Sequence, residues 1–317
     1  TLLSFMILRT LFGIAMGGEW GIGASLAMET IPVHWRGWVS GLLQAGYPSG
    51  YFLAAVVFGL FYPLVGWRGM FMIGGLPALL VVYLRTSVPE SPDWVTRAAA
   101  PRPAIGLVLR RHLGLLVWAV VMMTAFNFFS HGTQDLYPSA FLSVQHHFSH
   151  ATVTTIALVY NAGAILGGIG FGALSERIGR RFAIILASLL ALPVLPLWAF
   201  SSTPFWLGVG AFLMQICVQG AWGVVPAHLN ELSPPEIRAT FPGFVYQLGN
   251  FLASYNATIQ AAIGAHMNHT YSWALAGVAG TVAVLIALLV GFGPEARDIG
   301  MGGPDLSGAT APPGQTP

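Results

Sequence analysis

The sequence has no lysine, a single cysteine and very little charge. All 13 basic residues are arginine, and charged residues make up only 8% of the chain. One cysteine, Cys217, cannot form an internal disulfide. The formal net charge is +2, which gives no basis for a nucleic-acid surface, and no nucleophile stands with a base in the pattern of a covalent catalyst. The sequence therefore points away from an enzyme and from a nucleic-acid-binding protein.

Long apolar segments dominate the chain instead. Apolar residues account for 55% of the sequence, and the mean hydropathy is +0.71. A helix needs about 20 mostly apolar residues to cross a lipid bilayer. Nine runs approach or exceed that length, at about 3–28, 38–63, 69–87, 113–142, 152–174, 182–200, 205–229, 241–264 and 271–293. We therefore expect an all-α, polytopic membrane helical bundle with nine spans.

The arginines predict how these spans are oriented. Arginine-rich loops tend to stay on the cytoplasmic side of a membrane. If the first span runs from outside to inside, Arg68 lies outside and Arg9 lies within the first span. The other 11 are then cytoplasmic, namely Arg36, Arg85, Arg97, Arg102, Arg110, Arg111, Arg177, Arg180, Arg181, Arg238 and Arg297. We expect a multi-pass protein of the cytoplasmic (inner) membrane.

Two parts of the chain repeat each other at an offset of 202 residues. Gly18, Trp20, Gly21, Glu29, Pro32, Arg36 and Gly41 match Gly220, Trp222, Gly223, Glu231, Pro234, Arg238 and Gly243. Such a repeat indicates two related halves. We expect three spans at 1–87, a cytoplasmic inter-half loop at 88–112, six spans at 113–293 and a disordered tail at 294–317. Because six spans follow the loop and three precede it, we expect a chain truncated at its N-terminus.

A polar stripe interrupts the apolar run at 113–142. Asn127, Ser130, His131, Gln134 and Asp135 stand at i, i+3, i+4, i+7 and i+8, which is one face of a helix. An ionisable group in lipid costs about 2.5 to well over 10 kcal/mol, so the stripe should face a wet cavity. His131 and Asp135 can share a proton, and the three others can hydrogen-bond a carboxylate or hydroxyl. A satisfied polar network between helices is the alternative.

A second stripe consists of Gln247, Asn250 and Ser254, at i, i+3 and i+7. Gln247 and Asn250 are predicted to contact the substrate, although amides also hold membrane helices together, and the spacing alone does not separate the two roles. A weaker third stripe is interpreted as structural, and it contains Gln215, Gln219 and Trp222.

The remaining charged residues divide into two groups. Glu19 lies near the middle of the first span, where a carboxylate must be protonated or paired, so a proton-coupling role is predicted. Arg9 is its nearest cation in the same helix; otherwise Arg9 packs against helices outside the chain. The others stand at cytoplasmic ends and are predicted to hold the inward side closed: Glu29, Arg36, Glu176, Arg177, Arg180, Arg181, Glu231 and Arg238.

Three motifs resemble those of the major facilitator superfamily. Residues 172–181 resemble its loop between the second and third spans of a half, residues 9–17 its fourth-span motif, and residues 89–92 the stretch that closes the sixth span. The resemblance implies two six-helix halves joined by a cytoplasmic loop. The nine spans would then correspond to the fourth through twelfth.

The polar stripe is similar to the signature of proton-coupled monocarboxylate permeases, which group with the sialate symporters. Ser139 stands where that pattern has threonine. The resemblance adds Thr133 to the substrate-binding residues and implies symport of a lactate- or pyruvate-like carboxylate with a proton, by a monomer without cofactor or metal. Another metabolite, such as sialate, a sugar acid or an aromatic acid, is one alternative. A transport-inactive remnant or a sensor-like membrane protein is the other.

Overall fold

The computed structural model describes residues 2–87, 105–238, 240–268 and 270–295. Residues 88–104 of the expected loop and 296–317 of the expected tail lie outside the described residues, as do Arg97, Arg102, Arg297 and the 89–92 motif. The described residues contain no strand. Their helices are α1 (Leu2–Thr30), α2 (Arg36–Gly75), α3 (Leu80–Ser87), α5 (Ile105–Arg111), α6 (Leu113–Gln134), α7 (His150–Ile178), α8 (Arg180–Phe200), α9 (Pro204–Leu232), α10 (Phe241–Ala253), α11 (Asn256–His266) and α12 (Tyr271–Gly291).

Short helical turns connect several of these helices. A π-helix at Tyr137–Gln145 follows α6, and 3-10 turns lie at Val33–Trp35, Leu76–Leu79 and Pro235–Ile237. Within α2, Gly66 has φ 62° and ψ −174°, so the chain breaks helical geometry there. A positive φ of this kind favours glycine, which has no Cβ to clash.

The structure confirms an all-helical membrane bundle but does not confirm the count of nine spans. Among the described residues, seven segments are long and apolar enough to cross a membrane. The predicted span at 38–63 is part of the longer α2. The predicted span at 241–264 is divided, because α10 ends at Ala253 and α11 begins at Asn256. The hydropathy of a segment does not reveal such a break.

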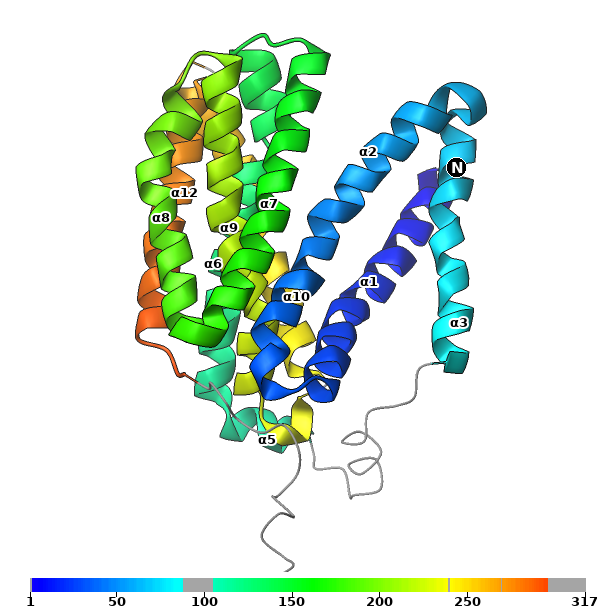
Figure 1. Ribbon diagram of the computed structural model, residues 1–317, viewed down its shortest axis with the longest axis vertical. Coiled ribbons are helices and arrows are strands. Elements are labelled where there is room, and N and C mark those ends of the chain that lie inside the picture. The colour runs from blue at the N-terminus through cyan, green and yellow to red at the C-terminus, as the bar shows by residue number, and fades with distance from the viewer. Residues whose placement is uncertain (1, 88–104, 239, 269, 296–317) are drawn as a thin grey trace, which may run out of the picture.

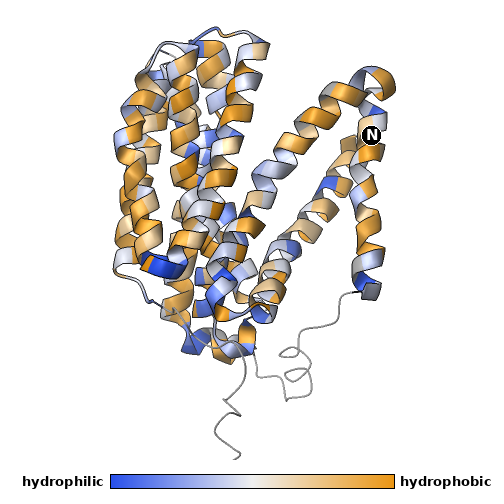
Figure 2. Cartoon of the chain, in the orientation of Figure 1, coloured by the Kyte–Doolittle hydropathy of each residue, from blue (hydrophilic) through white to orange (hydrophobic). Residues whose placement is uncertain are grey.

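Helices α6 to α12 form one bundle, and α1 to α3 lie beside it (Figure 1). Helix α9 packs against α7, α8, α6, α10, α1 and α2, so it lies at the centre of the contacts. Its residues are correspondingly buried over most of its length. The fully buried side chains of Phe126, Phe129 and Trp198 belong to the same core. Apolar residues cover the outer lengths of the helices (Figure 2), as expected for surfaces that face lipid.

The two groups of helices meet at one end of the bundle, which we call the Arg180 end. Here α1 and α7 end, and α2 and α8 begin. Close backbone contacts bring the helices together: a Cβ on Gly21 of α1 would lie 2.6 Å from Cα of Gly243 on α10, and Gly41 of α2 lies against the backbone of Gly168 on α7. Toward the opposite end, α2 leans away from α7 (Figure 1).

Candidate functional site

A cavity of about 420 Å³ lies between α6 and α10. One wall comes from the end of α6, which carries His131 and is capped by Asp135. The other comes from α10 and its C-terminal cap. The lining residues are His131, Asp135, Gln247, Asn250, Phe251, Ala253 and Ser254. This volume lies within the roughly 300–1,000 Å³ range of small-molecule sites. The structure thus brings together four of the predicted site residues: His131, Asp135, Gln247 and Asn250.

His131 and Asp135 lie within hydrogen-bonding distance of each other in the wall of the cavity. His131 Nδ1 lies 3.2 Å from Asp135 Oδ1, and the two side chains are 37% and 41% exposed. Asp135 caps the end of α6, where its backbone N–H donates to the His131 carbonyl at 3.0 Å. Asn250, on α10, lines the same cavity. The pair therefore remains accessible to a ligand while its geometry is fixed by the helix end.

The α10 side of the cavity ends at the break in the helix. Gln247 and Asn250 lie in the last two turns of α10, and Ser254 is its C-terminal cap. The side chain of Gln247 also lies close to Gly17 of α1. A Cβ atom added at Gly17 would be 3.9 Å from the Gln247 side chain. A break between helices leaves backbone carbonyl and N–H groups without helical partners. At this break the Ser254 N–H donates to the Phe251 carbonyl at 3.2 Å, so the side chains of Gln247, Asn250 and Ser254 supply the polar groups of this wall.

The other predicted residues of the α6 stripe do not line the cavity. Thr133 accepts a hydrogen bond from Gln215 Nε2 at 3.2 Å, and Gln134 Nε2 donates to Gln215 Oε1 at 3.1 Å. Gln134 also donates to the hydroxyl of Ser130 at 3.3 Å. Asn127 is 2% exposed and donates to the Met123 carbonyl of its own helix at 2.8 Å. The two contacts with Gln215 join α6 to α9, and the other two lie within α6.

Glu19 and Arg9 lie on α1, away from the cavity wall. Both residues are exposed, and no ion pair joins them within the described part of the chain. The Arg9 guanidinium instead lies 5.9 Å from the centre of the Phe5 ring and 6.0 Å from that of Phe12. Ten residues of helix correspond to about 15 Å, which explains why the two charges do not meet.

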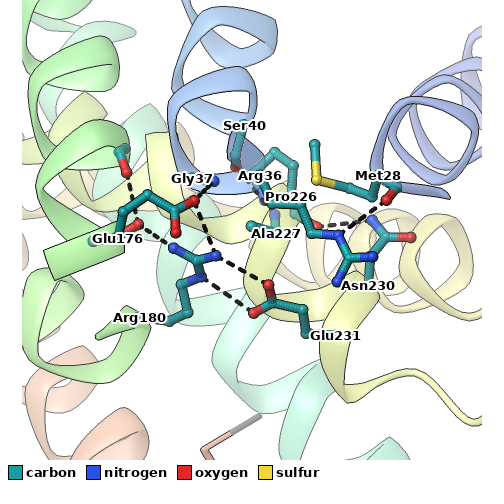
Figure 3. A network of polar contacts seen from close by, with 12 residues as sticks. Met28, Arg36, Gly37, Ser40, Glu176, Arg180, Pro226, Ala227, Asn230 and Glu231 are labelled. Atoms are coloured by element: carbon teal, nitrogen blue, oxygen red, sulfur yellow. Dashed lines mark hydrogen bonds and ion pairs between the residues drawn. The ribbon is translucent and has the colours of Figure 1, made fainter. Parts of the chain in front are cut away.

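A charged network joins helices at the Arg180 end (Figure 3). The Arg180 side chain is fully buried and donates to Glu231 at 3.1 and 3.2 Å and to Glu176 at 3.2 Å. Glu176 also accepts a hydrogen bond from the backbone N–H of Gly37, at the start of α2. A carboxylate at a helix N-terminus satisfies a free N–H and stabilises the helix dipole. Glu176 therefore connects α7 to the other half of the molecule.

The other predicted gate residues lie around this network. Arg36 Nε donates to the Met28 carbonyl at 3.1 Å and is 3% exposed. The Arg238 carbonyl accepts a hydrogen bond from Ser25 of α1 at 3.3 Å. Arg181 donates to the last turn of α12, with Nε 2.9 Å from the Val290 carbonyl. Two further predicted residues lie near the same end of α1 and α7: Glu29 and Arg177.

Sequence reasoning missed two contributors to the site. Phe251 lines the cavity and is 68% exposed, yet a phenylalanine in an apolar run gives no signal by itself. Its spacing of four residues from Gln247 is the one available indication. The sequence also did not indicate that three rings from α1, α9 and α10 meet: the Tyr246 ring lies 4.6 Å from that of Trp20 and 5.8 Å from that of Trp222.

Comparison with known proteins places this geometry in a family. Residues 1–254 and 128–300 match the model of the Major Facilitator Superfamily. A carboxylic acid transporter protein homolog of Saccharomyces cerevisiae is 30% identical over 92% of this chain, which spans 53% of that protein. The sialic acid transporter NanX of Escherichia coli is 26% identical over 90% of this chain, which spans 70% of NanX.

A solved structure has the same fold. The crystal structure of a double Trp mutant of XylE superimposes with a TM-score of 0.67 over 88% of this chain and 69% of that chain, at 18% identity. At this identity the likeness concerns the fold alone. Together with the apolar helices, the family match shows that this is a multi-pass membrane protein and that the chain belongs to the Major Facilitator Superfamily of transporters.

Proposed function

We propose that the protein is a secondary active transporter that moves a small carboxylate together with a proton by alternating access. The observation that carries the proposal is the His131–Asp135 pair, 3.2 Å apart in the wall of a cavity of about 420 Å³. Ionisable residues inside a membrane are costly and commonly mark substrate or proton pathways. The likeness to a yeast carboxylic acid transporter homolog supports a carboxylate as the substrate.

Substrate recognition is assigned to the α10 side of the cavity. The amides of Gln247 and Asn250 can donate to carboxylate oxygens and can accept from a hydroxyl group. A lactate- or pyruvate-like monocarboxylate has these groups. A larger acid such as sialate is the second candidate, supported by the likeness to NanX and by a cavity volume that exceeds the needs of a three-carbon acid.

Proton coupling is assigned first to His131 and Asp135. Adding a proton changes the net charge of the pair. That change alters the relative free energies of the conformations in which the cavity opens to one side of the membrane or to the other. Glu19 lies outside the cavity wall, so it is a secondary candidate for this role. The closed Arg180 end supports a cycle in which that end must open to release the substrate.

Uptake into proteoliposomes with an imposed pH gradient tests the proposal. His131→Asn and Asp135→Asn should each abolish proton-driven accumulation of radiolabelled lactate. Each variant keeps only one of the two groups that can share a proton. Protein yield and thermal unfolding should stay near those of the parent. His147→Asn, an exposed histidine in the loop before α7, is the matched control and should transport normally. Unchanged accumulation in both site variants would exclude the coupling assignment.

Competition experiments separate the remaining alternatives. Sialate, a sugar acid and benzoate are added in excess to the lactate uptake assay. Inhibition by one of them, with direct uptake of that acid, identifies the larger-acid alternative. A folded protein that neither accumulates nor exchanges any of these acids would instead favour the transport-inactive or sensor-like alternative.

A further inference from the structure

A serine of α2 makes two hydrogen bonds to the backbone of α9. Ser40 is fully buried, and its Oγ donates to the Gly223 carbonyl at 2.7 Å and accepts from the Ala227 N–H at 3.0 Å. Residues 223 and 227 are four apart, so their carbonyl and N–H groups are the pair that bond to each other in a regular α-helix. The hydroxyl thus bridges one step of the backbone ladder in a helix of the other half.

The local sequence makes this bridge possible. Pro226 has no N–H, so α9 already lacks one backbone hydrogen bond beside the bridged step. Both Gly41 and Gly223 lie against the backbone of Gly168, and this close approach of α2, α7 and α9 carries Ser40 to the α9 backbone. Side chains that enter a backbone ladder bend helices. The bridge therefore stabilises a particular shape of α9.

Helix α9 connects the bridge to the candidate site. Trp222 Nε1, next to the bridged step, donates to the Phe126 carbonyl of α6 at 3.2 Å. Two turns closer to the start of α9, Gln215 donates to Thr133 of α6 at 3.2 Å. Helix α6 carries the His131–Asp135 pair. A change in the shape of α9 therefore reaches the helix that forms the cavity wall.

We propose that the Ser40 hydroxyl is a latch between the two halves, which holds α9 in its present shape only while the Arg180 end is closed. When α2 withdraws, the Gly223 carbonyl and Ala227 N–H bond to each other, so neither group is left unpaired in the membrane. The latch can then release without the cost of buried, unsatisfied backbone groups. This inference rests on the proposed transport cycle and adds the contact that links its gate to its site.

Cysteine labelling tests the latch without any substrate. Cys217→Ala removes the single cysteine of the chain, and Met28→Cys then reports on the Arg180 end, because Met28 is fully buried and packs against Ala227 of the other half. Ser40→Ala should raise the rate of maleimide labelling at position 28 roughly three- to tenfold, which corresponds to the loss of a typical hydrogen bond.

A matched control is available in the same chain. Ser188 of α8 is also fully buried, and its Oγ has no hydrogen-bond partner among the described residues. Ser188→Ala removes the same atom from the interior and should leave the labelling rate unchanged. Equal rates in Ser40→Ala, Ser188→Ala and the parent would overturn the proposal.

Hydrogen exchange and a conservative variant provide a second test. Exchange at the Ala227 amide should be about as slow in Ser40→Ala as in Ser188→Ala, because without the hydroxyl that amide bonds to the Gly223 carbonyl. Faster exchange in Ser40→Ala would show that the two groups do not pair on release, and would overturn the latch. Ser40→Thr keeps the hydroxyl, so it should label and exchange like the parent. If Ser40→Ala does not fold, rapid labelling of Ser40→Thr would still overturn the latch, since the hydroxyl is then not the cause. If the labelling and exchange results are as expected but the protein does not transport lactate, the proposed function is contradicted and the latch is not.

Discussion

Glu176 is the carboxylate that holds α2 to α7, and its removal is the most direct perturbation of the closed end. Glu176→Ala deletes the acceptor for the Gly37 N–H at the start of α2 and one ion-pair partner of Arg180. Glu176→Gln keeps an acceptor oxygen but removes the charge. Arg180 retains Glu231 in both variants, so the C-terminal half should still fold.

The size of the effect follows from the geometry. A hydrogen bond to a charged group contributes about 1.5–3 kcal/mol, and the 18% exposure of the Glu176 side chain favours the lower part of that range. We take about 2 kcal/mol for Glu176→Ala, which shifts the equilibrium toward an open Arg180 end by roughly thirtyfold. Glu176→Gln loses the charged part of the interaction, about 1 kcal/mol, and should shift it roughly fivefold.

Labelling of Met28→Cys in the cysteine-free background measures this shift. The expected order of labelling rates is Glu176→Ala, then Glu176→Gln, then the parent. Glu236→Ala is the control, because Glu236 is an exposed carboxylate in the turn before α10 and should have no effect. The reasoning is refuted if Glu176→Ala labels no faster than Glu236→Ala, or if the two Glu176 variants label equally fast.

Three further predictions concern the cavity, the α6–α9 network and the contact between halves. Gln247→Ala should raise the KM for uptake several-fold at normal expression, whereas an effect on expression alone would indicate a packing role. Gln215→Leu should lower the thermal unfolding temperature, with a loss of about 1 kcal/mol and little change in KM, because its hydrogen bonds join helices rather than face the cavity; a large change in KM would contradict this. Gly21→Ala should reduce transport strongly, since its Cβ would lie 2.6 Å from Cα of Gly243, while Gly50→Ala, with nothing within 4 Å, should be neutral in the same assay.

The sequence predicted the helical bundle and the two faces of the cavity because both depend on local periodicity. The spacing of His131 and Asp135 fixes them on one side of α6, and that of Gln247 and Asn250 does the same on α10. It did not predict that the α6 stripe would divide. Gln134 is three residues from His131, about 60° around the helix, and it bonds to Gln215 of α9 while His131 lines the cavity beside α10.

Features that depend on contacts between distant segments were not predictable in this way. Ser40 is an ordinary small residue in an apolar run, and its role arises only where α2 crosses α9. The ion pair of Arg180 with Glu231 joins residues 51 apart, and the sequence indicated only that both stand near the same membrane face.

The interruption between α10 and α11 has a consequence for the chemistry of inhibitors. The break at Ser254 and Tyr255 adjoins the cavity, which Ser254 lines. The amide and hydroxyl groups of this wall need water or another hydrogen-bonding molecule, and leaving such a group dry costs several kcal/mol. A purely hydrocarbon compound that displaced this water would bind poorly however well it fitted. Useful blockers should therefore carry acceptors and donors that replace the displaced solvent.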